Sequence, residues 1–152
     1  MPLNHDFVGR KAARAAPFEV TRGDIRRFAT AIGDASPACH DLAAAQALGH
    51  RDLVAPPTFL ITLAMAGRSD VLADPELGLQ YEFVVHGQQK FELRRPICAG
   101  DVLDSEARIE DIRDARDNEL MQIITEISCE GEPVATATNT LVSRGTAAAR
   151  EA

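Results

Sequence analysis

The second half of the chain alternates between apolar and polar residues, and this period of two constrains the fold more than any other feature. From residue 103 to 110, apolar or small side chains stand at odd positions and mostly charged ones at even positions. The pattern returns over residues 121–127 and in the run VATATNTLV. Such alternation predicts strands with one buried and one solvated face. The short turn segments DARDN and EGEP between these runs predict an antiparallel meander.

The first half is predicted to be mainly helical. Thr21 and Asp24 form a capping-box pair before a run with apolar residues at helical spacing, which ends at Gly33. Asp41 is positioned to cap a second, short helix. The run from Thr58 to Met65 is apolar nearly all round, which is typical of a buried helix, and we expect it to be the central one.

Length and composition indicate one α+β domain spanning residues 1–152, with a core at about 7–144 and a flexible C-terminal tail. A net charge of −7 argues against nucleic acid as the main partner, because phosphate binding needs a concentrated basic surface. The longest apolar run, Phe59–Ala66, is shorter than the roughly 20 residues that cross a bilayer. We therefore expect no membrane partner, and a cytoplasmic protein.

The three cysteines, Cys39, Cys98 and Cys129, lie far apart and lack the spacing of a zinc or redox site. We expect reduced thiols and no metal. An antiparallel sheet with one dry face and an apolar helix to cover it indicates the hot-dog architecture, in which a curved sheet wraps around a long central helix. One helix covers little of such a sheet, so a dimer that joins two sheets edge to edge is also expected.

Four ordered blocks carry a resemblance to a known family. They are VGR, PFEVTRGDIRRFATAIGDASPACHD, ALGHRDLVAPPTF and VVHGQQKFELRRPICAGDVL. From about Phe7 to Arg144 the chain resembles the MaoC-like acyl dehydratases, and more closely the HadA/HadC type of subunit of bacterial (3R)-hydroxyacyl-ACP dehydratases. The resemblance implies a hot-dog fold and acyl thioesters of acyl carrier protein or coenzyme A as substrates. It also implies reversible loss of water from a 3-hydroxyacyl chain, without a metal or redox cofactor.

The segment GDASPACHD departs from the family pattern at the residue that matters most. Catalytically complete relatives carry an aspartate and a histidine in a GDxNPxH segment, whereas here Asp34 is followed by Cys39 at the histidine position, and His40 comes one residue late. In an extended segment, a slip of one residue sends the side chain to the opposite side. HadA/HadC-type subunits are similarly broken here, and a HadB-type partner carries the intact pair. The resemblance therefore implies a remnant of an active-site loop.

Dehydration needs a base for the C2 proton, an acid for the departing hydroxyl, and donors for the charge that develops on the thioester oxygen. Backbone N–H groups at the start of the central helix, near Pro57, Thr58 and Phe59, are the candidate donors. Further candidates fall into two groups. An apolar tunnel beside Phe59, Leu60 and Leu63, with the strand break at His86 and Gly87, is expected to bind substrate, and Arg94 and Arg95 are expected to contact an acidic carrier or its phosphate.

Three functions remain open at this point. The first is the substrate-binding, catalytically incomplete subunit of a heteromeric dehydratase. The second is a self-sufficient (R)-specific enoyl-thioester hydratase, a homodimer that uses Asp34 and His40. The third is a nonenzymatic acyl-thioester binder. Taken alone, most of these residues also have a structural reading: Asp34 as a turn residue, Cys39 as a buried filler, His86 as a structural histidine and Arg94 as part of a solvated face.

Overall fold

The computed structural model describes residues 1–66 and 69–147. Its five strands form one antiparallel sheet in the order β1-β3-β4-β5-β2. The strands are β1 (Phe18–Glu19), β2 (Val84–Leu93), β3 (Val102–Ala115), β4 (Asn118–Cys129) and β5 (Glu132–Ser143). The helices are α1 (Arg22–Ile32), α2 (Leu42–Ala47), α3 (Ile61–Ala66) and α4 (Ser69–Leu72), with 3-10 turns η1 (His5–Phe7), η2 (Pro37–Cys39), η3 (Pro75–Leu77) and η4 (Tyr81–Phe83).

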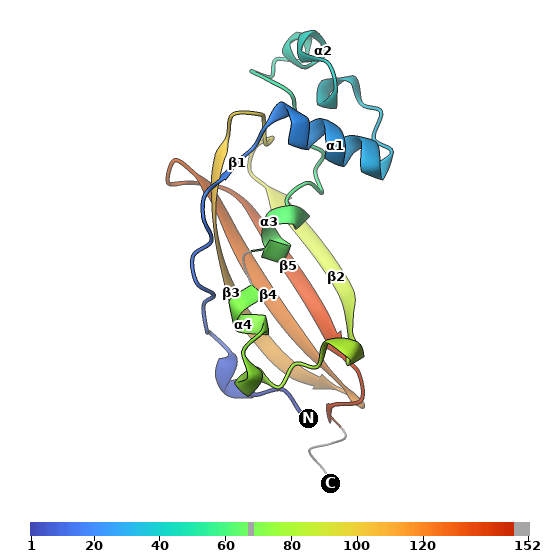
Figure 1. Ribbon diagram of the computed structural model, residues 1–152, viewed down its shortest axis with the longest axis vertical. Coiled ribbons are helices and arrows are strands. Elements are labelled where there is room, and N and C mark those ends of the chain that lie inside the picture. The colour runs from blue at the N-terminus through green and yellow to red at the C-terminus, as the bar shows by residue number, and fades with distance from the viewer. Residues whose placement is uncertain (67–68, 148–152) are drawn as a thin grey trace.

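The sheet is long and curled, and α3 and α4 lie across one of its faces, while α1 and α2 gather at one end (Figure 1). This arrangement confirms the predicted α+β fold, in which a curved antiparallel sheet wraps around helices. The buried alternation is confirmed on the central strands, where the inward residues are at most 8% exposed. On β3 and β4 they are Leu103, Ser105, Ala107, Ile109, Met121, Ile123, Thr125 and Ile127.

The central helix begins later than its sequence predicts. The apolar run begins with turns, in which the Phe59 N–H donates to the Pro56 carbonyl at 2.9 Å, and α3 begins only at Ile61. The described helical segments here are α3 and α4, and residues 67–68 between them lie outside the described part.

The first half otherwise folds as expected. The capping box at the start of α1 is complete, because the Thr21 hydroxyl accepts the Asp24 N–H while the Asp24 carboxylate accepts the Thr21 N–H. The helix ends at Gly33, whose φ of 73° is the left-handed conformation that glycine adopts freely. The Asp41 side chain caps α2 through the Ala43 N–H. These caps fix both ends of the loop that carries Asp34.

Two residues of the predicted flexible tail are packed against the rest of the protein. Thr146 and Ala147 are buried, and the Ala147 N–H donates to the Asp117 carbonyl at 3.2 Å across the β3–β4 turn. The rest of the predicted tail, residues 148–152, lies outside the described residues. Within the described part of the chain, no helix is long and apolar enough to cross a membrane.

Candidate functional site

A pocket of about 550 Å³ lies between the loop after α1, the turn before α3 and the segment that follows β2. It collects predicted residues from three distant stretches of sequence: Asp34 and Cys39, Pro57, and Arg94 and Arg95. Its apolar lining comes from Val54, Ala55, Pro56 and Leu93. Charged groups therefore stand at an apolar hollow that is large enough for part of a small ligand.

The carboxylate of Asp34 has a fixed orientation in this pocket. The Asp34 N–H donates to the Ala29 carbonyl at 2.8 Å, which holds the residue against the end of α1. Its Oδ1 accepts the Ser36 N–H at 2.9 Å, as in an Asx turn. Its Oδ2 faces the thiol of Cys39, at an Sγ–Oδ2 distance of 3.9 Å. The group that shares the pocket with this carboxylate is thus a thiol.

His40 is turned away from the Asp34 carboxylate. Its ring nitrogen Nε2 lies 2.7 Å from the Asp34 backbone carbonyl, and its backbone N–H closes η2 by donating to the Pro37 carbonyl. The imidazole therefore contacts the main chain of the loop, and His40 is not among the residues that line the pocket.

The thiol of Cys39 is 4% exposed, within the main hydrophobic core. Burial raises its pKa above the ordinary value, and the negative charge of Asp34 raises it further. A thiol in this state is mainly protonated at neutral pH, so it is a poor nucleophile and a poor base.

The predicted tunnel residues belong to the core. Phe59, Leu60 and Leu63 are at most 5% exposed and pack in the same cluster as Cys39, while Thr58 is exposed. Phe59 makes an edge-on ring contact with Phe28 at a centroid distance of 5.5 Å. Its N–H is already bonded, as described above, so Phe59 does not offer that donor to a thioester oxygen.

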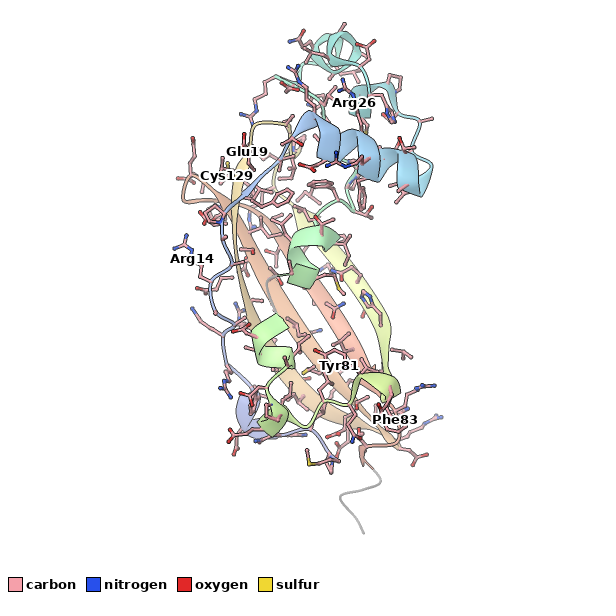
Figure 2. The ribbon with its side chains drawn as sticks, viewed as in Figure 1. Arg14, Glu19, Arg26, Tyr81, Phe83 and Cys129 are labelled. Atoms are coloured by element: carbon pink, nitrogen blue, oxygen red, sulfur yellow. The ribbon has the colours of Figure 1, made fainter. Side chains whose placement is uncertain are left out.

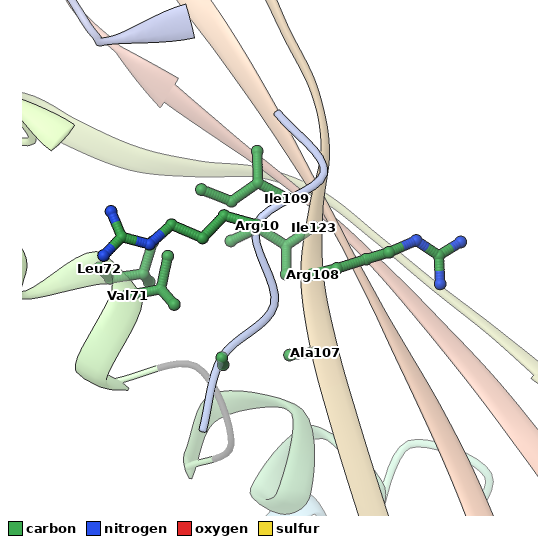
Figure 3. Close-up of a pocket in the computed structure, with 8 residues that line it drawn as sticks. Arg10, Val71, Leu72, Ala107, Arg108, Ile109 and Ile123 are labelled. Carbon is green, nitrogen blue, oxygen red and sulfur yellow. The ribbon is translucent and has the colours of Figure 1, made fainter. Parts of the chain in front are cut away.

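Phe59 also lines a second hollow, of about 380 Å³. The hollow is bounded by Phe18, Phe28 and Thr62 and by the charged side chains of Asp24 and Arg27. A third recess, beneath α4, holds only about 10 Å³, roughly the space of one water. Figure 3 shows its lining, with Val71 and Leu72 facing Ile109 and Ile123. That recess is a packing gap and is too small for an acyl chain.

His86 and Gly87 lie on β2, away from the pocket. The register of β2 against β5 shifts between His86 and Gln88, so the predicted strand break is a bulge. A Cβ added to Gly87 would stand 2.9 Å from the Val142 side chain, which explains the glycine by a close approach of β5. His86 hydrogen-bonds the buried amide of Asn139.

Arg95 forms part of a cluster that the sequence reasoning did not foresee. Asp101, 2% exposed, accepts hydrogen bonds from Arg95 at 2.8 and 3.0 Å and from Arg51, and also from the Cys98 N–H at 2.9 Å. Burial works against ionisation of Asp101, but the hydrogen bonds and the two guanidinium charges outweigh it, so the pKa of this carboxyl lies below its ordinary value. Two cations share one anion here, which leaves a net positive charge.

The outer sides of these arginines line a hollow of about 400 Å³ next to the pocket, together with His50, Pro96 and Cys98. His50 and Arg95 line both spaces. The sequence carried a signal for the missed residues, because His50, Arg51 and Asp101 all fall inside the blocks that carry the family resemblance.

The chain matches the model of the FAS1-like dehydratase domain region over residues 6–137. It belongs to this dehydratase family. A UPF0336 protein of Parafrankia sp. is 50% identical over 151 residues, which cover 99% of this chain and 100% of that protein. A UPF0336 protein of Saccharopolyspora erythraea is 47% identical over 148 residues, covering 97% of this chain and 95% of its own length.

Solved structures place the chain among MaoC-like hot-dog folds. A MaoC-like dehydratase superposes with a TM-score of 0.84 at 31% identity, covering 91% of this chain and 42% of that longer one. The HadBC (3R-hydroxyacyl-ACP dehydratase) complex of Mycobacterium tuberculosis superposes with a TM-score of 0.83 at 30% identity, covering 92% of this chain and 99% of that chain. The ChsH1–ChsH2 complex of the same organism shares the fold at 21% identity, with a TM-score of 0.68 and coverage of 90% and 91%. Two of these three structures are complexes of different subunits.

Proposed function

We propose that this chain is the acyl-thioester-binding subunit of a (3R)-hydroxyacyl thioester dehydratase, and that its partner, a second hot-dog subunit of the HadB type, supplies the catalytic aspartate and histidine. One observation carries the proposal. The group that faces Asp34 in the pocket is the protonated thiol of Cys39, while His40 contacts the main chain. Of the aspartate–histidine pair that catalytically complete relatives carry, the aspartate is thus present, but no imidazole faces it.

The reaction needs a group that can both accept and donate a proton near neutral pH. Imidazole does this, whereas a buried thiol with a raised pKa does not. Binding is a separate contribution, because burial of methylene groups does not depend on proton transfer. The apolar lining of the pocket and the hollow beside Phe59 are the surfaces that this chain would offer to an acyl group.

The cluster of Arg51 and Arg95 on Asp101 supports recognition of a phosphate ester next to the pocket. Both guanidinium groups are partly exposed, and the hollow of about 400 Å³ that they line shares His50 and Arg95 with the pocket that contains Asp34. Coenzyme A and acyl carrier protein both present a thioester joined to a phosphate through pantetheine. Arginine binds phosphate in a fixed geometry, so this cluster would hold the phosphate while the acyl chain enters the apolar lining.

The edge strand β2 supports a partner subunit. It is the last strand of the sheet, and Val85 and Leu93 are 41% and 36% exposed along it. Figure 2 shows Tyr81 and Phe83 near the start of β2, and these rings are 62% and 43% exposed. An edge with exposed apolar side chains is a site of strand pairing, so a second hot-dog subunit would continue the sheet here.

Acyl-thioester affinity measured against chain length tests the binding role. The purified chain, with and without a HadB-type partner, is titrated with a series of enoyl thioesters of increasing length. We expect binding to tighten with each added methylene, by up to about 0.8 kcal/mol, until the space is filled. Asp34→Asn should leave these affinities nearly unchanged. Equal affinity for short and long chains in both cases would remove the binding role.

A further inference from the structure

A row of polar side chains crosses the sheet at the end remote from the pocket. Asp114 of β3 stands directly opposite Glu119 of β4, which in turn stands directly opposite Ser143 of β5. Residues opposite one another in an antiparallel sheet project from the same face, with Cβ atoms roughly 5 Å apart. Glu119 and Ser143 are 0% and 1% exposed, whereas Asp114 is exposed. The row therefore leads from the surface into the protein.

The N-terminal segment brings an imidazole to this row. His5 lies in η1, and its Nε2 is 3.6 Å from the Glu119 Oε1. The other carboxylate oxygen, Oε2, accepts the Leu3 N–H at 2.8 Å, which fixes the orientation of the group. One ligand atom each from His5, Asp114 and Glu119 lies within 4.8 Å of the other two. Figure 1 shows the N-terminus at the end of the sheet where β3 turns into β4.

The hydroxyl of Ser143 provides an independent observation. Although this side chain is buried next to Glu119 in the register, its Oγ finds no hydrogen-bond partner among the described residues. Buried hydroxyl groups nearly always have a partner. A ligand at this row, or a water bound to that ligand, would satisfy the Ser143 hydroxyl.

We propose that His5, Asp114 and Glu119 bind one divalent transition-metal ion, with Zn²⁺ as the preferred ion and Ser143 as a hydrogen-bonding neighbour. Two donors about 2.1 Å from a tetrahedral zinc ion stand about 3.4 Å apart, close to the observed separation of the His5 and Glu119 donors. No two of these donor atoms are more than 4.8 Å apart, so reaching the spacing of a zinc site takes a movement of at most about 1.4 Å, which the exposed side chain of Asp114 can make.

Charge and ligand chemistry favour this ion over other cations. Asp114 and Glu119 stand directly opposite each other, so one carboxylate oxygen from each can reach a divalent ion between them. A site with one imidazole and two carboxylates suits zinc, whereas Mg²⁺ and Ca²⁺ prefer shells made of oxygen alone. Zn²⁺ would thus join the N-terminal segment to the β3–β4 hairpin, at a place independent of the proposed thioester pocket.

Isothermal titration of the untagged, chelator-treated full chain with Zn²⁺ and, separately, with Mg²⁺ tests the site. We expect one Zn²⁺ per chain, at least tenfold weaker Mg²⁺ binding, and a rise of the unfolding temperature with stoichiometric Zn²⁺. His5→Ala and Asp114→Asn, both at exposed positions, should weaken Zn²⁺ binding at least tenfold and abolish the thermal shift. Asp6→Asn, an exposed carboxylate in the same turn as His5, is the matched control and should bind like the wild type.

Circular dichroism of the two variants establishes that they fold. Absence of Zn²⁺ binding by the wild-type chain would overturn the proposal. Zn²⁺ binding that survives both His5→Ala and Asp114→Asn unchanged would overturn it too, since the ion would then lie elsewhere. Equal affinity for Mg²⁺ would overturn the assignment of the imidazole as a ligand. None of these outcomes depends on acyl-thioester binding.

Discussion

The thiol of Cys39 faces the carboxylate of Asp34 at 3.9 Å, although the neighbouring His40 places its ring nitrogen only 2.7 Å from the carbonyl oxygen of the same aspartate. The loop thus brings a histidine next to Asp34 but gives it the main chain as a partner. A dehydratase needs an imidazole at the position that the Cys39 thiol occupies here, whereas binding of an acyl thioester does not. The role of residue 39 can therefore be tested directly.

The Cys39 thiol should be alkylated slowly at pH 7. Burial and the Asp34 charge raise the pKa of this thiol, which lowers the fraction of reactive thiolate. Asp34→Asn keeps an oxygen for the Ser36 N–H but removes the charge, so alkylation should become several-fold faster. The rate is measured by mass spectrometry of the iodoacetamide-labelled peptide that contains Cys39. An unchanged rate in Asp34→Asn would show that the carboxylate does not influence the thiol.

Replacing Cys39 by histidine should create hydration activity in the isolated chain. The new imidazole would face Asp34, and a positioned acid–base group contributes on the order of 10²–10⁴-fold at best, so a gain of about tenfold or more is expected. Adding Asp34→Asn to Cys39→His should remove the gain. Hydration of a crotonyl thioester is followed by loss of the enoyl absorbance. A folded Cys39→His chain with no gain would mean that the loop no longer aligns the dyad.

Asp101→Asn should destabilise the protein by about 1.5–3 kcal/mol at pH 7, because hydrogen bonds between a buried carboxylate and charged donors are lost. The pH dependence has a defined sign. The pKa of Asp101 is lowered in the folded state, so its contribution is complete above the unfolded-state pKa of about 3.9 and is lost as the pH falls below that value. Denaturant unfolding from pH 3 to 7 should therefore show less loss of stability on acidification in Asp101→Asn. Parallel pH profiles of the two proteins would contradict this.

Arg51→Gln should weaken binding of a coenzyme A thioester more than binding of the matching pantetheine thioester, which lacks the phosphate. The expected loss is about tenfold, as for one charge-assisted contact. Arg14→Gln is a matched control, because Arg14 is exposed and pairs with Asp104 on β3, away from the pocket (Figure 2). Equal losses for the two ligands would exclude phosphate recognition by Arg51. The same measurement can be made with an acyl carrier protein thioester, whose phosphate is also joined to the thioester through pantetheine.

Gly87→Ala should destabilise the β2 edge by about 1–3 kcal/mol, since the new methyl group would meet the Val142 side chain at 2.9 Å. Gln88→Ala, at the next position of the same bulge, adds no such clash and serves as the comparison. Thermal unfolding of both variants measures the effect. A Gly87→Ala chain as stable as Gln88→Ala would show that β5 yields to a side chain here.

Much of the fold could be predicted because its signals are local. Alternation over residues 103–110 specifies a strand face, and the pair Thr21 and Asp24 specifies a helix start, without reference to distant residues. The start of the central helix could not be read in this way. Its apolar run is equally compatible with a helix and with buried turns. The hydrogen bond from the Phe59 N–H to the Pro56 carbonyl shows that its first residues form turns.

The candidate site was predictable only in part, for a similar reason. Asp34 and Cys39 are neighbours in sequence, so their relation follows from the loop. The contact of Arg51 with Asp101 joins two segments of the chain that are 50 residues apart, and no spacing rule connects them. His86 illustrates the converse. The predicted bulge is present, but the ring hydrogen-bonds Asn139 on β5 at a distance from the pocket.

The most direct test of the central claim is the rate of hydration of an enoyl thioester by the purified chain, alone and after mixing with a HadB-type subunit that carries an intact aspartate–histidine pair. We predict that the chain alone is close to background and that His40→Ala leaves this rate unchanged, because His40 contacts the Asp34 carbonyl. The mixture should turn over and should favour longer acyl chains than the partner alone. Robust turnover by the isolated chain that is abolished by His40→Ala would contradict the account and establish a self-sufficient hydratase.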